Sequence, residues 1–396
     1  MLAKSHIRNM MVMIVTVLSG GGILALASLK TAALELTVTG PQQIIFDSDV
    51  SGCDGHHLPD APARAFRDDQ GRMILFAPNF QNRAFVGYGF DSLKPDCDSR
   101  FMAAGKAQPD LLDDRTWIHA VYTNDGKTVY ALGSASFMPY RHNMPCKGRT
   151  QRIDCWINGL VTLKSTDSGK TFDYLGKPPH HAPFPPPQPY RDDRKIAPSY
   201  VTVTNIINWQ NYLYAIVWRR EEEWKNSRNC LVRAPANDPS SWQVWDGNDF
   251  IDAAQLTDDG WQVHQTDCAR VGPRGITSIR GLVRHEGSNT FIAIYQHRQR
   301  NKDGTDRHGI FYSTSSDMKV WSEPYLLLAE DLMPDAGPGD PFAAYATMID
   351  EDSQDRLFGT VDDTASLVFV RLIPKRHNGG WRVPRQLVRY RVSIRK

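Results

Sequence analysis

The sequence predicts an all-β fold, a five-bladed β-propeller, on two observations. First, from Asp60 onward the chain falls into repeated units of a strand, a tight polar turn, a second strand, and a third strand that leads into a turn and an aromatic residue. Repeats of roughly 40 to 50 residues with four strands each are typical of propellers. Second, one unit ends in residues 165–172, STDSGKTF, and four other segments can be laid over that unit.

The segment 165–172 has the residue types of a tight turn between two strands. Asp167 can accept hydrogen bonds from the backbone of its own turn, and Gly169 takes a positive φ without strain. Phe172 is expected to pack between neighbouring sheets. We therefore predict a structural role for this segment, away from any active centre.

The first two units contain hairpin turns at 69–71 and 124–127, both rich in Asp and Gly, as hairpins require. The strands expected in these two units are 63–68 and 72–77, then 118–123, 128–133 and 156–164.

The last three units repeat the pattern, with a degenerate copy of the turn at 313–317 ahead of Trp321. Their expected strands are 201–208, 212–218 and 230–234, then 278–285, 291–296 and 311–313, then 345–350, 356–360 and 367–372, with closure near Trp381.

Two further segments belong to this fold. Residues 34–46 alternate β-branched and other residues, and we expect them to supply the missing edge strand of the last blade, since ring closure removes an exposed sheet edge. Residues 178–189, PPHHAPFPPPQP, are too rich in proline for a central strand. They are either a stiff surface connector or a wall over one face of the ring, with His180, His181 and Phe184 toward a ligand.

Residues 1–33 have the composition of an export signal or an N-terminal anchor. Basic residues lead into an apolar run from Met10 to Ala27, followed by small residues. If this segment is cleaved, the protein is secreted or periplasmic and its single β-propeller domain is 34–396. If it is not cleaved, the apolar run is about long enough to span a membrane as an anchor, roughly 18 residues being the threshold.

Six cysteines follow this segment, which favours disulfides in an oxidising compartment. Sequence neighbours pair Cys53 with Cys97, Cys146 with Cys155 and Cys230 with Cys268, although six cysteines allow 15 pairings and the sequence alone cannot choose. No C-x-x-C occurs, so a zinc site is a poor alternative. Lys and Arg total 46 against 44 Asp and Glu, which argues against a nucleic-acid partner.

Polar residues recur at similar heights on the first strand of each unit, the strand that lines the channel of a propeller. Counting back from each hairpin turn places five of them in one layer at the channel mouth: Arg64, His119, Asn205, Arg280 and Tyr345. Each also has a structural interpretation. The two arginines can bridge blades through backbone carbonyls. His119 and Asn205 can be polar residues of the channel that are hydrogen-bonded to water, and Tyr345 can serve only to pack against its neighbours.

The motif S-x-D-x-G-x-[TS]-[FW] at 165–172 resembles the Asp-box, or BNR repeat, of sialidases and related propellers. Residues 60–75 look like the opening blade of sialidase-like propellers, whose first arginine binds a substrate carboxylate. This resemblance implies a substrate-binding role for Arg64 and for Arg280, with Asn205 beside them. It also raises the alternative of a six-bladed, sialidase-type propeller.

The same pattern is similar to secreted bacterial glycosidases of the arabinanase and xylosidase clan, which need two or three carboxylates in the channel. The resemblance implies Asp60 as one catalytic carboxylate, with Asp340 and Asp350 less well placed, and Tyr345 as a nucleophile of the sialidase type. His119, from the polar layer at the channel mouth, is a further catalytic candidate. Neither catalytic pattern is complete, since no glutamate is evident that would activate Tyr345.

These features predict a carbohydrate-active protein, a glycoside hydrolase acting on an acidic glycan at the channel mouth. The alternative is a non-catalytic glycan-binding or scaffold propeller. No cofactor is expected, apart from a structural calcium that residues 335–341, DAGPGDP, could ligate through carboxylates and carbonyls.

Overall fold

The computed structural model describes residues 34–147, 155–194, 196–252, 267–300, 303–333 and 336–396. Residues 1–33 lie outside this range, so the expectation of a signal or anchor stays a prediction. None of the helices in the described ranges is long and apolar enough to cross a membrane. Helix is confined there to 3-10 turns: η1 (Phe90–Ser92), η2 (Pro109–Leu111), η3 (Pro139–His142), η4 (Trp224–Asn226) and η5 (Glu286–Ser288).

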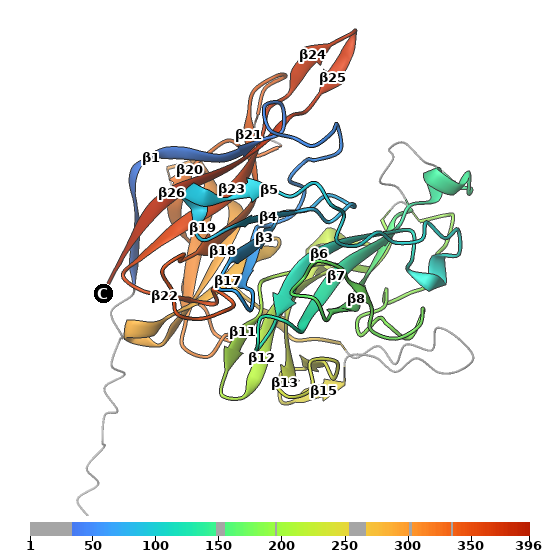
Figure 1. The fold of residues 1–396 in the computed structure, drawn as a ribbon, viewed down its shortest axis with the longest axis horizontal. Coiled ribbons are helices and arrows are strands. Elements are labelled where there is room, and N and C mark those ends of the chain that lie inside the picture. Colours follow the sequence, from blue (N-terminus) through green and yellow to red (C-terminus); the bar gives the residue numbers. More distant parts are fainter. Residues whose placement is uncertain (1–33, 148–154, 195, 253–266, 301–302, 334–335) are drawn as a thin grey trace, which may run out of the picture. The chain divides into compact units, whose positions relative to one another are not determined.

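The strands form antiparallel sheets in which neighbours in sequence are mostly neighbours in space, giving a propeller-like arrangement of blades (Figure 1). The first two sheets are β2 (Arg64–Arg67), β3 (Met73–Phe76), β4 (Ala84–Gly87) and β5 (Lys94–Pro95), and β6 (Arg115–Tyr122), β7 (Val129–Phe137), β8 (Ile157–Ser165) and β9 (Asp173–Tyr174).

The third and fourth sheets are larger. The third contains β10 (Ser199–Val203), β11 (Ile207–Trp209), β12 (Tyr212–Arg220), β13 (Arg228–Pro235), β14 (Gln243–Trp245), β15 (Phe250–Asp252) and β16 (Arg270–Val271). The fourth contains β17 (Ile279–His285), β18 (Thr290–Arg300), β19 (Asp306–Ser315) and β20 (Tyr325–Ala329), with β22 (Thr360–Val361) parallel to β17.

The last large sheet joins the two ends of the described chain. Its order is β1 (Glu35–Asp47), β26 (Arg385–Arg395), β23 (Thr364–Leu372) and β21 (Phe342–Ile349). β1 runs antiparallel to β26, from Glu35 opposite Arg395 to Asp47 opposite Gln386. The prediction that residues 34–46 supply the edge strand of the last sheet is therefore confirmed.

The strands predicted for the fifth unit are partly wrong. Residues 356–360 do not form its second strand: Asp355 accepts hydrogen bonds from Leu357 and Gly359 in a turn, and the guanidinium of Arg356 donates to the carbonyls of Arg67 and Asp68. The third strand is β26, in which arginines are interspersed with apolar residues. Trp381 lies instead on the exposed hairpin of β24 (Lys375–His377) and β25 (Gly380–Arg382).

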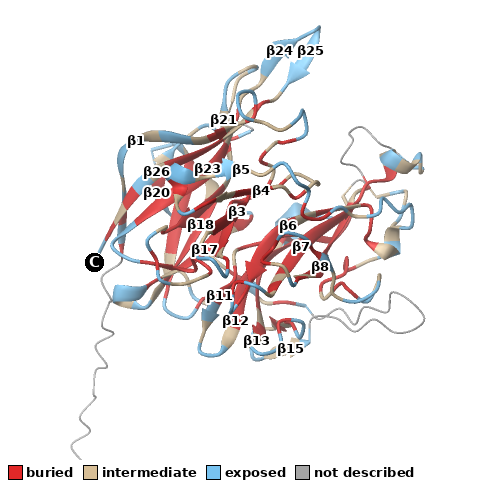
Figure 2. Cartoon of the chain, viewed as in Figure 1, coloured by how far each residue is buried: buried red, intermediate tan, exposed pale blue. Residues whose placement is uncertain are grey.

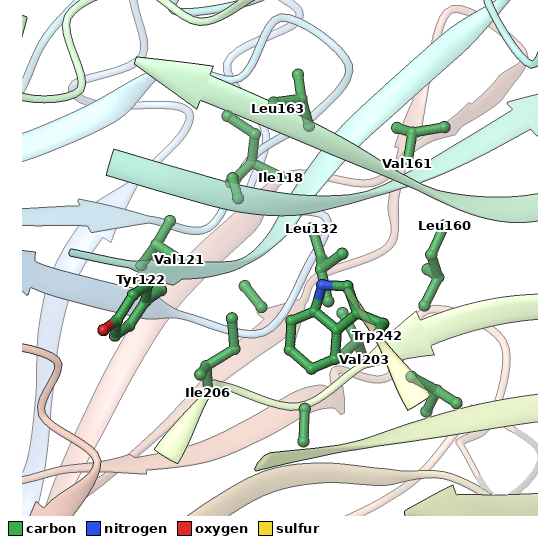
Figure 3. Close-up of a cluster of buried hydrophobic side chains, with 14 of the residues drawn as sticks. Ile118, Val121, Tyr122, Leu132, Leu160, Val161, Leu163, Val203, Ile206 and Trp242 are labelled. Atoms are coloured by element: carbon green, nitrogen blue, oxygen red, sulfur yellow. The ribbon is translucent and has the colours of Figure 1, made fainter. Parts of the chain in front are cut away.

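The inner strands of the large sheets are mostly buried on both faces, as expected when each blade packs between two others, whereas the edge strand β1 is largely exposed (Figure 2). In β7, eight of nine positions are buried. A large cluster packs side chains of the second and third sheets together, with Ile118 and Leu132 from one and Val203 and Trp242 from the other (Figure 3).

The turn at 165–172 has the contacts predicted for it. Asp167 Oδ1 accepts the backbone N–H groups of Lys170 and Thr171, at 3.0 and 2.9 Å, and Gly169 has a φ of 76°. Phe172 is buried, with its ring 6.1 Å from that of Phe76 in the first sheet. The turn therefore packs one sheet against its neighbour.

The covalent framework is also as predicted. The structure contains the disulfides Cys53–Cys97, Cys146–Cys155 and Cys230–Cys268, which are typical of an oxidising compartment. The proline-rich loop pairs its backbone with the edge of β8, since Phe184 and Leu160 exchange hydrogen bonds. Phe184 is buried, whereas His180 is exposed and lines a cavity of about 250 Å³ together with His181. The wall interpretation is therefore wrong for Phe184 and stays a prediction for the two histidines.

Candidate functional site

Arg64 ties the innermost strands of the five large sheets together. It is almost completely buried, with 1% of its surface exposed, and all five of its guanidinium N–H groups are used within the protein. The acceptors are His119 O at 2.7 Å, Ala63 O at 2.9 Å, Thr347 Oγ1 at 3.2 Å, Val203 O at 3.0 Å and Arg280 O at 2.6 Å. These contacts match the bridging role named above as the alternative for this residue, and in this conformation they leave no donor for a substrate carboxylate.

Irregular strand pairing places the predicted residues around Arg64. The register shifts between Ile118 and Ala120 in β6, Tyr200 and Thr202 in β10, Ile279 and Gly281 in β17, and Ala344 and Thr347 in β21. His119, Arg280 and Tyr345 lie within these shifts. Bulges disrupt the ladder and re-aim side chains next to functional sites. The carbonyls of His119 and Arg280 can therefore turn toward Arg64.

The backbone of Tyr345 is strained, with a φ of 60° in a residue other than glycine. Gln296 holds this conformation from the neighbouring sheet: its Oε1 accepts the N–H of Tyr345 at 3.0 Å, and its Nε2 donates to Ala343 O at 2.9 Å. Backbone strain that the surrounding structure maintains in this way is typical of binding and catalytic sites.

The Tyr345 hydroxyl donates to Asp60 Oδ1 at 3.1 Å. Arg385 also pairs with Asp60 Oδ1 and donates to Pro59 O at 2.8 Å. Burial raises the pKa of Asp60, against the opposing effect of Arg385. The charge of Asp60, and then burial, raise the pKa of Tyr345. Burial therefore disfavours the charged form of both groups, and the phenol donates to a carboxyl oxygen.

Arg280 has no such partners. Its guanidinium carbon lies 5.7 Å from the centre of the Tyr345 ring, yet its N–H groups make no hydrogen bond or ion pair with any residue in the described ranges. The side chain is partly accessible, and burial lowers its pKa. A partly accessible guanidinium without a protein acceptor leaves its N–H groups open to a ligand or water.

Two further buried polar groups, one close to Asp60 and one close to Arg280, lack a hydrogen-bond partner among the described residues. The buried Nε1 of Trp117 lies near enough to Asp60 to lower the pKa of that carboxyl, but makes no hydrogen bond of ordinary geometry with the described residues. His119 Nδ1 is likewise buried without a partner there. Burial, then the charges of Arg64 and Arg280, lower the pKa of His119 to about 3, so its imidazole is neutral.

These side chains form the central cluster, namely Asp60, Trp117, His119, Arg280, Tyr345 and Arg385. Trp117 and Tyr345 each precede, by two residues, the residue of their own strand that contacts Arg64. Asp60 precedes β2, so the cluster lies toward the N-terminal ends of the innermost strands. The sequence analysis missed Trp117 and Arg385; counting back one more inward position from His119 would have found Trp117.

Asn205 is not part of this cluster. Its side chain joins the third sheet to the fourth, since its Oδ1 accepts the N–H of Leu282 at 2.9 Å and its Nδ2 donates to Leu282 O at 2.5 Å. Asn205 follows Val203, the Arg64 contact of the third sheet, by two residues, whereas Tyr345 precedes Thr347, the Arg64 contact of the last sheet, by two. Its amide is already used, as its structural interpretation anticipated.

Asp60 is the carboxylate of this cluster, and within the described ranges no second carboxylate contacts it. Asp350 lies at the far end of β21, where it accepts the N–H groups of Asp352 and Asp362. Asp340 is exposed in a loop beside Gly337. Asp335 lies outside the described residues, and those that are described contain no group of three metal-ligating side chains, so calcium at 335–341 stays a prediction.

No family model matches the chain, and no curated protein matches it. Among solved structures, a Dyadobacter fermentans protein of unknown function aligns with 11% identity over 92% of this chain and 100% of its own, with a TM-score of 0.49. An α-L-arabinanase from Cellvibrio cellulosa, complexed with arabinohexaose, aligns with 10% identity over 84% and 96%, with a TM-score of 0.43. A sucrose-6-phosphate hydrolase from Lactobacillus gasseri aligns with 11% identity over 86% and 62%, with a TM-score of 0.44. All three TM-scores are below 0.5, so the proposals below rest on this chain's own residues.

Proposed function

We propose that the five large sheets are the five blades of one ring, and that the central cluster binds an acidic glycan through Arg280. In this account Arg64 holds the ring together, and Arg280 recognises the carboxylate of a sialic or uronic acid. A guanidinium presents paired N–H groups that match a planar carboxylate. The observation that carries the proposal is the unpaired guanidinium of Arg280 beside two unsatisfied donor or acceptor groups.

The surrounding residues fit a sugar ligand. The Trp117 N–H can donate to a ring or hydroxyl oxygen, and the neutral His119 can accept from a hydroxyl. The ring of Tyr345 offers an apolar surface next to the charge of Arg280. A small number of convergent polar groups beside aromatic surface is typical of small-molecule sites.

The test is a calorimetric titration of the protein with galacturonic acid and with galactose, which lacks the carboxylate. The wild type should bind the acid, and Arg280→Gln should lose about tenfold or more in affinity, the scale of hydrogen bonds to a charged group. Arg284→Gln changes an arginine four residues along the same strand that contacts Asn289, and should leave affinity unchanged. Equal binding of both sugars by the wild type contradicts the proposal.

Hydrolysis is a second candidate, favoured by the contact between Tyr345 and Asp60. The Tyr345 oxygen could attack the anomeric carbon while Asp60 accepts the phenolic proton, as in glycosidases with a tyrosine nucleophile. The leaving oxygen also requires an acid, and in the described part of the chain no further carboxylate touches the cluster. Binding is therefore the better-supported function.

The two candidates separate in one assay. Release of reducing ends from an acidic oligosaccharide by the wild type, lost in Tyr345→Phe, would establish hydrolysis. If Tyr345→Phe retains affinity and the wild type releases no product, the site is a binding site. We further propose export to the cell exterior or periplasm, supported by the three disulfides and the leader-like residues 1–33. Cell fractionation tests this directly.

A further inference from the structure

A cavity of about 460 Å³ lies next to the start of β17, the strand that carries Arg280. Its lining includes two tryptophans and three cations, and none of its lining residues is acidic: Trp218, Trp224, Lys225, Arg270, Arg274 and Thr277 are its principal members. Arg280 follows Thr277 by three residues, a distance of about 10 Å along a strand. The cavity is therefore within reach of a ligand longer than one sugar that is held at Arg280.

The tryptophans form a platform. Trp218 is buried at the end of β12, and Trp224 stacks on it with 5.2 Å between ring centres and 29° between planes. Trp224 remains 54% exposed, although a large apolar ring in water is costly. Its backbone is fixed by the hydrogen bonds of η4, including Ser227 N–H to Trp224 O at 3.0 Å. A rigid aromatic ring with an accessible surface suits the apolar face of a sugar.

Two of the three cations at this cavity have no carboxylate partner in the described part of the chain. Lys225 pairs with Glu223 at 3.0 Å, and the nearby carboxylates of Glu221 and Asp267 are used by Arg219 and Arg228, at distances of 2.6 to 3.3 Å. Among the described residues, Arg270 donates only to the backbone carbonyl of Lys225, at 3.3 Å. Arg274 is exposed and makes no hydrogen bond or ion pair with the described residues. The cavity therefore offers a positive charge for an anion next to an aromatic ring on which a sugar can stack.

We propose that this cavity is a second subsite for an acidic oligosaccharide, in which Trp224 stacks against a sugar ring and Arg270 and Arg274 bind its carboxylate. The inference rests on the proposed function at Arg280 and extends it from a single acidic sugar to a polyanionic glycan of several residues. A ligand that occupies both places gains affinity because the second contact is intramolecular.

The test compares galacturonic acid with tetragalacturonate on the full chain. Trp224→Ala and Arg274→Gln should each lower the affinity for the tetramer by about tenfold, the scale of one aromatic or charged contact, and leave the affinity for the monomer unchanged. Trp381→Ala is the matched control, since Trp381 is 48% exposed on the hairpin of β24 and β25. Unchanged melting temperatures establish that the variants are folded; if Trp224→Ala is not, Trp224→Phe and the exposed Arg274→Gln carry the test.

Tetramer affinity equal to wild type in both cavity variants overturns the second subsite. In that case, a loss of monomer binding in Arg280→Gln leaves the proposed function intact. Conversely, if Arg280→Gln binds the monomer as the wild type does, the proposed function fails, while a tetramer loss in the cavity variants still supports the subsite. Failure of the wild type to bind either probe overturns both.

Discussion

The hydroxyl of Tyr345 donates a hydrogen bond to Asp60, joining residues that are 285 positions apart in the sequence. Asp60 precedes the innermost strand of the first sheet, and Tyr345 lies on the innermost strand of the last. The contact therefore forms only when the first and last sheets lie side by side. It also places a carboxylate, a phenol and the unpaired guanidinium of Arg280 in one cluster.

Arg64→Lys should lower the free energy of unfolding by about 3 kcal/mol. Lysine offers three donors where Arg64 uses five, so at least two of the five acceptors lose a charged hydrogen bond. Urea denaturation measures the change, with the exposed Arg395→Lys as control. Native stability together with weaker binding of acidic sugars would restore the ligand-binding role predicted for Arg64.

Asp167→Ala should lower the free energy of unfolding by about 1 to 2 kcal/mol and leave ligand affinity unchanged. The carboxylate accepts three hydrogen bonds from Lys170 and Thr171, and the turn lies away from the central cluster. Asp173→Ala, at an exposed neighbouring position, is the control. A variant of native stability that no longer bound the ligand would show that turn and site are not separate.

Deleting residues 34–46 should abolish soluble expression. The deletion removes the buried side chains of Leu36 and Phe46 and exposes the edge of β26, and an unpaired edge promotes aggregation. Replacing the exposed hairpin 375–382 with a short glycine linker is the control, because its two strands pair with each other and its ion pairs to Asp49, from Lys375 and Arg382, lie at the surface. A truncated protein with an unchanged denaturation midpoint would mean that β1 does not close the last sheet.

Stability should fall as the pH is lowered from 7 to 4, because three histidines are held neutral by burial. Burial lowers the pKa of His57 and His181 to about 4, and of His119 to about 3, from 6.5. Between these values and 6.5 the unfolded chain binds more protons than the folded one, so acid favours unfolding. Asp60 has the opposite effect: burial raises its pKa, so the folded chain binds its proton more tightly than the unfolded chain, and its contribution to stability falls as the pH rises.

His119→Asn should flatten this pH dependence by at most about 1.4 kcal/mol per pH unit, the linkage limit for one proton. His377→Asn, on the exposed hairpin, should not change it. Urea midpoints measured at several pH values for both variants give the slopes. Equal slopes in His119→Asn and the wild type would mean that His119 has the same pKa in the folded and the unfolded protein.

The sequence predicted the parts of the fold that depend on local pattern. The closing strand 34–46, the turn at 165–172 and the three disulfide pairs follow from alternation, turn chemistry and proximity in the chain. β26 was not predicted, because its place between β1 and β23 depends on pairing with a strand from the other end of the chain. The strand predicted at 356–360 was wrong because these residues form hydrogen bonds within a turn and with the first sheet, which local pattern does not indicate.

The site was predicted as a set of residues but not as a set of contacts. Counting back from the turns placed His119, Arg280 and Tyr345 near one another, and the structure brings them together. Which arginine is buried among carbonyls and which is left unpaired depends on strand bulges and on packing from other sheets. Neither is visible in a single sequence, and Arg64 and Arg280 were therefore given the same role.

The most direct measurement of the central claim is a crystal structure of the complex with galacturonic acid. The account predicts that the sugar carboxylate pairs with the Arg280 guanidinium, with the Trp117 N–H and His119 Nδ1 hydrogen-bonded to the same ligand, while Arg64 keeps its carbonyl contacts. A sugar bound elsewhere, with Arg280 untouched, or a carboxylate bound by Arg64 after its release from the strands, would contradict it.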